Sequence, residues 1–152
     1  MDRNEIDDLY RHAILDHCRD PRNHDKIAEP TLSGRALNPF CGDEVEIQAT
    51  LEGERAKLVG AQGVGCSINQ ASTSMLAEAI DGKSIEEMEA IATGFRGMMS
   101  SMEPPDEALV RHSDLTSLAG VRSFPVRIKC ALLAWSALED AIDSYRRENK
   151  PL

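Results

Sequence analysis

The chain has 152 residues, of which 41% are hydrophobic and 28% are charged, so we expect one globular domain over residues 1–152. Its 26 acidic and 17 basic residues give a net charge of −9, which argues against a nucleic-acid-binding protein, because such proteins carry a basic surface. The sequence has no run near the roughly 18 apolar residues that a membrane span needs, and its charged N-terminus does not resemble a signal peptide, so we expect a cytoplasmic protein.

The first half of the sequence predicts one helix and two strands. Apolar residues recur at helical spacing over residues 4–18, and a segment with Pro and Asn ends that pattern. We expect residues 24–40, which hold two prolines and a glycine, to be mostly irregular. Apolar and polar residues alternate over 44–51, which predicts a half-buried strand. The second strand, 56–62, follows a short turn, so the two strands should form an antiparallel hairpin.

The second half of the sequence predicts helices. They are expected at about 67–80, 84–99, 114–119 and 125–147, with a loop over 100–108. The second of these helices opens with a capping box, and the last opens with a proline, which the first turn of a helix tolerates. The order of elements indicates an α+β domain. In it, helices pack on one face of a small antiparallel sheet of about three strands, and a long helix ends the chain.

Four residues at the junctions between these elements are candidates for binding a metal ion. Cys41 and Asp43 lie just before the first predicted strand, Cys66 lies between the second strand and a helix, and Cys130 lies in the first turns of the last helix. Side chains at such junctions can converge at one end of a sheet. Three thiolates and one carboxylate would form a complete tetrahedral site for zinc.

The spacing of the cysteines leaves a second interpretation open. A free cysteine is often a small buried hydrophobic residue, and the chain has no CxxC pair. We expect Cys18, at the end of the first helix, to contribute only to packing or to the surface. The nearby histidines His12, His17 and His24 are expected to have ordinary exposed or capping positions.

Three motifs, each centred on a cysteine, resemble one protein family. The segments NPFCGDEV, GVGCSINQASTSM and FPVRIKCALLAWSAL are similar to the IscU/NifU-N superfamily of iron–sulfur cluster assembly proteins, in the same order along the chain. The opening LYRHAILDHCRDPRNH resembles the start of the SufU branch. The resemblance covers residues 8–142, and the three motifs together are more specific than any one of them.

The resemblance implies a zinc-dependent sulfurtransferase of the SufU type. Cys41, Asp43, Cys66 and Cys130 then match the four zinc ligands. Cys41 also matches the catalytic thiol, which accepts persulfide sulfur from a pyridoxal-phosphate-dependent cysteine desulfurase of the SufS type. Downstream iron–sulfur assembly proteins would be further partners. The alternative is a scaffold of the IscU type, which assembles an iron–sulfur cluster on the same four residues.

Two features favour the SufU branch over the scaffold branch. Scaffolds of the IscU type carry a ligand histidine before the third cysteine, and this chain has Lys129 there. The separation of 64 residues between Cys66 and Cys130 is also longer, with the extra residues at about 98–114. Arg127 and Lys129 can offset the negative charge of the ligands, and Arg127 is also a candidate for contact with the partner protein.

Overall fold

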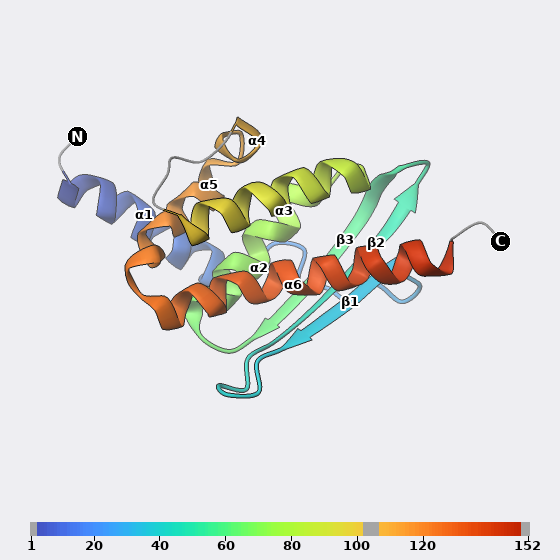
Figure 1. Ribbon diagram of the computed structural model, residues 1–152, viewed down its shortest axis with the longest axis horizontal. Helices are drawn as coiled ribbons and strands as arrows, with labels where there is room; N and C mark the ends of the chain where they lie inside the picture. The colour runs from blue at the N-terminus through green and yellow to red at the C-terminus, as the bar shows by residue number, and fades with distance from the viewer. Residues whose placement is uncertain (1–2, 102–106, 150–152) are drawn as a thin grey trace.

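A three-stranded antiparallel sheet positions the candidate site (Figure 1). The computed structural model describes the backbone of residues 3–101 and 107–149, and the side chains in these ranges other than those of residues 3–10, 108, 110 and 113. The strands are β1 (Leu32–Leu37), β2 (Glu44–Glu52) and β3 (Arg55–Val64), in the order β1-β2-β3. The predicted hairpin is therefore present as β2 and β3.

The helices lie together on one side of this sheet in Figure 1. The long helix α6 packs along β1 and β2, and α2 packs along β3 and α6. On this layer α1 packs against α2, and α3 packs against α2 and α6. The helices are α1 (Arg3–Arg19), α2 (Ser67–Ile80), α3 (Ile85–Ser100), α4 (Glu107–Val110), α5 (Ser113–Thr116), the 3₁₀ helix η1 (Ser117–Ser123) and α6 (Pro125–Glu148). The predicted α+β class, with a long C-terminal helix, is confirmed.

The edge strand β1 corrects the prediction that residues 24–40 are mostly irregular. It pairs with β2 residue by residue, from Leu32 opposite Ala49 to Leu37 opposite Glu44. The strand was missed because Gly34 stands where an apolar side chain would complete the alternation. A Cβ atom at Gly34 would lie 2.2 Å from the carbonyl oxygen of Ala137 in α6. Glycine is therefore needed here, because the backbones of β1 and α6 are in direct contact.

The buried histidine His17 corrects a second expectation, that the histidines near the first helix are exposed or capping. Its side chain is fully buried, with Nδ1 2.8 Å from Ser74 Oγ of α2 and Nε2 2.8 Å from Asp114 Oδ2 of α5. Ser74 Oγ also accepts a hydrogen bond from the Arg22 backbone N–H. His17 thus connects α1 to α2 and α5, whereas His12 is exposed as expected.

The remaining helix predictions hold with small changes. Ser84 Oγ accepts a hydrogen bond from the Glu87 N–H, as the capping box predicts. Of the loop expected over 100–108, residues 102–106 lie outside the described residues, and Glu107 already belongs to α4. Among the described residues, no helix is both long and apolar enough to cross a bilayer.

Candidate metal centre

The loop between β1 and β2 carries two of the candidate ligands. It is closed by its own hydrogen bonds, from Asn38 N–H to the Asp43 carbonyl and from Gly42 N–H to the Asn38 carbonyl, each 2.8 Å long. Gly42 has a φ of 75°, which a glycine adopts without strain. This turn leaves Cys41 exposed at its tip and directs Asp43 inward at the start of β2.

Asp43 is a buried carboxylate with an oxygen that has no partner. Its side chain is 5% exposed, and Oδ2 has no hydrogen-bond partner among the described residues. A Cβ atom at Gly65 would lie 2.2 Å from Asp43 Oδ1, so only glycine leaves room for the carboxylate. Because a buried charge is costly unless it is paired, this carboxylate indicates a cation at the site.

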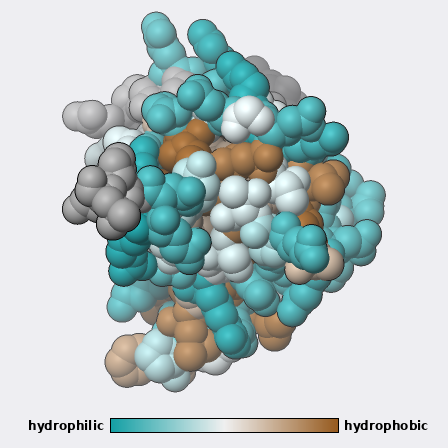
Figure 2. All heavy atoms as spheres, turned by 90° about the vertical axis from the view of Figure 1, so that its right-hand side faces the viewer, coloured by the Kyte–Doolittle hydropathy of each residue, from teal (hydrophilic) through white to brown (hydrophobic). Residues whose placement is uncertain are grey.

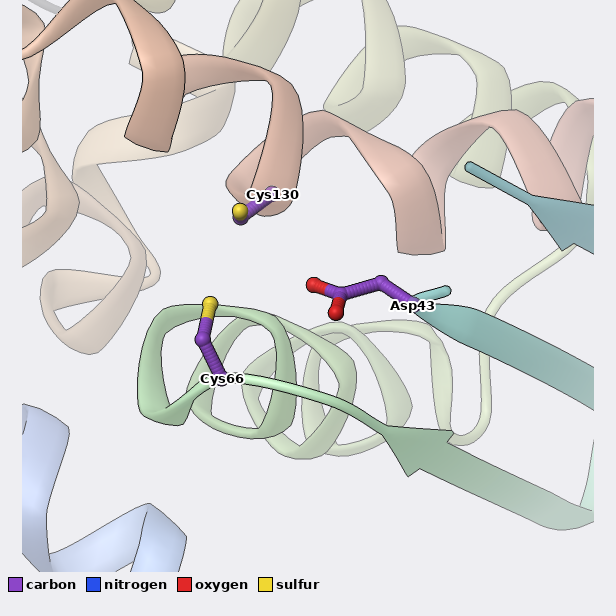
Figure 3. Close-up of side chains that lie close together, drawn as sticks. All are labelled: Asp43, Cys66 and Cys130. Atoms are coloured by element: carbon purple, nitrogen blue, oxygen red, sulfur yellow. The ribbon is translucent and has the colours of Figure 1, made fainter. Parts of the chain in front are cut away.

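Two cysteines face this carboxylate from different elements. Cys66 precedes α2 at the N-cap position, with an extended backbone (φ −68°, ψ 166°), and its side chain makes no capping hydrogen bond. Cys130 lies in the second turn of α6 and is buried. The ligand atoms of Asp43, Cys66 and Cys130 all lie within 4.8 Å of one another. Figure 3 shows the three side chains pointing into the same space.

The Cys130 thiol is protonated at neutral pH when no cation is bound. Burial raises the pKa of Cys130 to about 12, and a hydrogen bond with Cys66 contributes to that rise. The negative charges of Cys66, Asp43 and Cys41 act in the same direction. A coordinated divalent metal ion reverses this balance, because a metal-bound thiol loses its proton.

Cys41 lies beside this group but outside it. Its sulfur is not among the ligand atoms that lie within 4.8 Å of one another. Instead Cys41 is exposed and lines a hollow of about 350 Å³ together with Cys130 and Lys129. The structure thus brings three of the four predicted ligands together and places the fourth on the neighbouring rim.

The donor set fits zinc. Zinc prefers sulfur, nitrogen and carboxylate ligands in a tetrahedral arrangement, and soft thiolates select it over magnesium or calcium. Cys66, Cys130 and Asp43 supply three such ligands, and Cys41 is the nearby residue that would supply the fourth. Sequence reasoning proposed all four as ligands but missed the role of Gly65. The sequence shows a glycine before Cys66, but it does not show that the Asp43 carboxylate packs against that glycine.

The two predicted auxiliary residues have different positions. Lys129 lines the hollow together with Cys41 and Cys130, beside the ligands whose negative charge it was expected to offset. The Arg127 guanidinium lies over the Phe124 ring, 5.3 Å from the ring centre, in a cation–π contact. Arg127 is therefore held on the surface next to the hollow.

Comparison with known proteins shows the family to which this chain belongs. Residues 9–151 match the family described as the NifU-like N terminal domain. The zinc-dependent sulfurtransferase SufU of Bacillus subtilis (strain 168) is 39% identical over 137 residues, which make up 90% of this chain and 91% of that protein. The iron–sulfur cluster assembly scaffold protein IscU of Streptococcus pyogenes serotype M1 is 35% identical over 142 residues, or 93% of this chain and 87% of that protein.

A solved structure shows the same fold. The crystal structure of FiSufU from Fervidobacterium islandicum AW-1 superposes with a TM-score of 0.76 at 32% identity, covering 86% of this chain and 93% of that one. The family suggested by the three cysteine motifs is confirmed. The chain belongs to the family of NifU-like N-terminal domains, whose members include proteins of iron–sulfur cluster assembly.

Proposed function

We propose that this protein is a zinc-dependent sulfur transfer protein of iron–sulfur cluster assembly. It accepts persulfide sulfur on Cys41 from a pyridoxal-phosphate-dependent cysteine desulfurase and passes it to downstream assembly proteins. The observation that carries the proposal is the buried Asp43 Oδ2, which has no hydrogen-bond partner among the described residues and lies close to two thiols, with an exposed third thiol at Cys41 beside them. Its similarity to a zinc-dependent sulfurtransferase supports the same function.

The proposed zinc site is made by Cys66, Cys130 and Asp43, with Cys41 as the fourth ligand. Bound there, zinc would keep its sulfur ligands deprotonated at neutral pH, where a free thiol with a pKa of about 8.5 is mostly protonated. The three grouped ligands come from the rigid ends of a strand and two helices. They are suited to holding the ion while the fourth ligand reacts.

Cys41 is the thiol best placed to accept sulfur. The Cys41 thiolate attacks the terminal sulfur of the donor persulfide, a new S–S bond forms at Cys41, and the donor cysteine leaves as a thiolate. The step needs no oxidant, because one sulfur atom moves between two thiolates. Cys130 is buried in α6 and cannot approach a donor, whereas Cys41 is exposed at the tip of a loop. Cys66 is exposed too, but its sulfur already belongs to the group with Asp43 and Cys130. Lys129, on the same rim, stabilises the negative charge on the Cys41 sulfur.

The alternative is a scaffold that assembles an iron–sulfur cluster on Cys41, Asp43, Cys66 and Cys130. The similarity to a protein named as an IscU scaffold favours it, and the same donor set would serve. The two functions differ in what the purified protein contains. A colourless protein with about one zinc per chain supports sulfur transfer, whereas a brown protein after anaerobic reconstitution supports the scaffold.

The test of sulfur transfer is Cys41→Ala in an assay of cysteine desulfurase turnover. The variant should abolish stimulation of the desulfurase and should not gain the mass of a sulfur atom after incubation with the loaded enzyme. Cys18→Ala is the matched control, since Cys18 is a free, partly exposed cysteine that donates a hydrogen bond to the Ser67 carbonyl. Full stimulation by Cys41→Ala would remove Cys41 as the acceptor.

A further inference from the structure

The hollow beside Cys41 has an apolar rim made by Phe40, Phe124 and Val126. The exposed fractions of these side chains are 96%, 55% and 79%. Phe40 and Val126 line the hollow, and Phe124 precedes Pro125, which also lines it. Single exposed apolar residues are common in folded proteins, but a group of them around one hollow marks an interaction surface.

The apolar rim protrudes from the molecule. In Figure 1 the loop between β1 and β2, which carries Phe40, extends below the sheet. In Figure 2, seen from the side, apolar side chains lie at that lower end, and another apolar group lies above the centre of the same face. A partner that approaches from this end therefore meets Phe40 before it meets the buried part of the site.

The loop holds Phe40 in a defined position. The Phe40 N–H donates a 3.1 Å hydrogen bond to Asn38 Oδ1, and two backbone hydrogen bonds close the turn around it. A turn that is already fixed loses little backbone conformational entropy when a partner covers it. Phe40 also lines the same hollow as Cys41, so a donor whose sulfur reaches Cys41 through this hollow passes next to Phe40.

The charge next to the apolar rim differs from the charge of the whole chain. The chain carries a net charge of −9, but the charged residues that accompany the rim on α6 are the cations Arg127 and Lys129. An aromatic residue flanked by cations fits a partner surface with an apolar pocket and acidic groups around it.

We propose that Phe40 is the main anchor by which this chain binds its sulfur donor, inserting into an apolar pocket next to the persulfide-bearing cysteine of the cysteine desulfurase. This inference rests on the proposed function, since it assumes that a desulfurase is the donor. Acidic groups of the desulfurase face Arg127 and Lys129. The anchor sets how tightly the two proteins bind, whereas Cys41 sets whether sulfur moves.

The test compares Phe40→Ala with Leu58→Ala. Leu58 is a matched control because it is also an exposed apolar side chain, 55% accessible, but it lies in β3 near the opposite end of the sheet. We expect Phe40→Ala to raise the dissociation constant for the desulfurase, measured by titration calorimetry, by roughly 10- to 100-fold, as is typical of an aromatic hot spot. Leu58→Ala should change it by less than about two-fold, as for a residue outside the interface.

Kinetics provide a second readout. Phe40→Ala should raise the concentration of this protein that gives half-maximal stimulation, while the plateau rate and the zinc content stay unchanged. Phe40→Leu should recover part of the affinity, because leucine retains most of the apolar surface. An unchanged dissociation constant for Phe40→Ala, or an equal loss in Leu58→Ala, overturns the inference.

Failure of this inference is distinguishable from failure of the proposed function. Calorimetry with Cys41→Ala and with the Phe40→Ala, Cys41→Ala double variant measures binding without any sulfur transfer. If Cys41→Ala still stimulates the desulfurase, sulfur acceptance fails, while the calorimetric comparison still decides the role of Phe40. The role of Phe40 as an anchor is overturned if the parent protein does not bind the desulfurase. It is also overturned if sedimentation shows that Phe40→Ala instead dissociates a dimer of this chain.

Discussion

Asp43 is the residue that most directly indicates a cation. Its buried Oδ2 has no partner among the described residues, and two thiols lie beside it. A folded protein keeps such a group only when something offsets the loss of hydration. The carboxylate should therefore destabilise the metal-free protein and stabilise the metal-bound protein. A substitution that removes its charge should have opposite effects on the stability of the two states.

Replacing Asp43 with Asn tests this reversal. Asparagine keeps the shape of the side chain but removes its charge, so the metal-free variant should melt at or above the temperature of the metal-free parent. Loss of a residue that only hydrogen-bonds to a metal ligand typically weakens metal binding by roughly 10- to 100-fold. Loss of the Asp43 charge should weaken zinc binding by more than this. Thermal melting with and without zinc, together with competition against a zinc chelator, measures both effects. A variant with the affinity of the parent would show that Asp43 is not a ligand.

Gly65 leaves room for the Asp43 carboxylate because it has no side chain. A methyl group there would lie 2.2 Å from Asp43 Oδ1, and the φ of 145° is one that other residues rarely adopt. We expect Gly65→Ala to cost about 1–3 kcal/mol of stability and to weaken zinc binding, because the carboxylate is displaced. The measurements are urea denaturation and zinc competition.

Gly97→Ala is the control for that experiment. Gly97 lies in α3, and a Cβ atom there would have nothing within 4 Å. Alanine should therefore stabilise the helix by about 0.5–1 kcal/mol, with zinc binding unchanged. If Gly65→Ala behaved like Gly97→Ala, the close approach to Asp43 would have no energetic importance.

At the scale of elements, His17 joins three helices. Its two ring nitrogens contact Ser74 and Asp114, which lie 57 and 97 residues further along the chain. Removing the imidazole leaves the buried Ser74 hydroxyl without one of its partners and opens space in the core. We expect His17→Ala to reduce the free energy of unfolding by about 1–3 kcal/mol, measured by urea denaturation. The control is His12→Ala, on the exposed side of α1, whose free energy of unfolding should stay within about 0.5 kcal/mol of the parent value. An equal loss in both variants would contradict the claim that His17 connects α1 to α2 and α5.

The elements show which parts of the fold the sequence determines locally. The helices and the β2–β3 hairpin were predictable because their patterns of apolar residues and their caps lie within each segment, as with Ser84 and Glu87. The strand β1 and the burial of His17 could not be predicted in this way. Position 34 needs a glycine because the α6 backbone lies against it, and His17 can be buried because Ser74 and Asp114 bind its two ring nitrogens. Both features depend on contacts between distant parts of the chain.

The candidate site divides in the same way. Cysteine-centred motifs identified the four candidate ligands, and their positions at junctions suggested that they converge. The sequence does not reveal that Asp43 is buried while Cys41 is exposed, because a turn closed by Asn38 and Gly42 directs these neighbours to opposite environments. The apolar rim was missed for a related reason, since Phe40 and Val126 come together only in the folded chain.

At the scale of the whole molecule, the candidate metal centre lies at the margin of the core, and of its candidate ligands Cys130 belongs to the buried apolar cluster. Phe95 and Trp135 stack with ring centres 4.8 Å apart and are fully buried between the helices. The ligands, in contrast, lie at the ends of elements. The free energy of folding should therefore come mainly from the apolar core, with the metal ion adding local order.

Removing the metal ion tests this division. After dialysis against a chelator, the far-ultraviolet circular dichroism should keep its helical signal, while amide hydrogen exchange should become faster in the loop before β2 and at the start of α2. Binding of an ion to the folded state alone also stabilises it by mass action, so the melting temperature should fall. Loss of all helical signal would show instead that the ion is required for folding, as in zinc fingers.

The loop that carries Cys41 is closed by hydrogen bonds between its own residues, from Asn38 to Asp43, and the strands that it joins are paired up to Leu37 and Glu44. Changes at the loop tip therefore need not disturb the register of the sheet or the packing of α6. If the proposed function holds, residue 40 can vary to suit a different donor protein while the fold stays intact, and exchanging the loop tip between relatives would change which donor is bound.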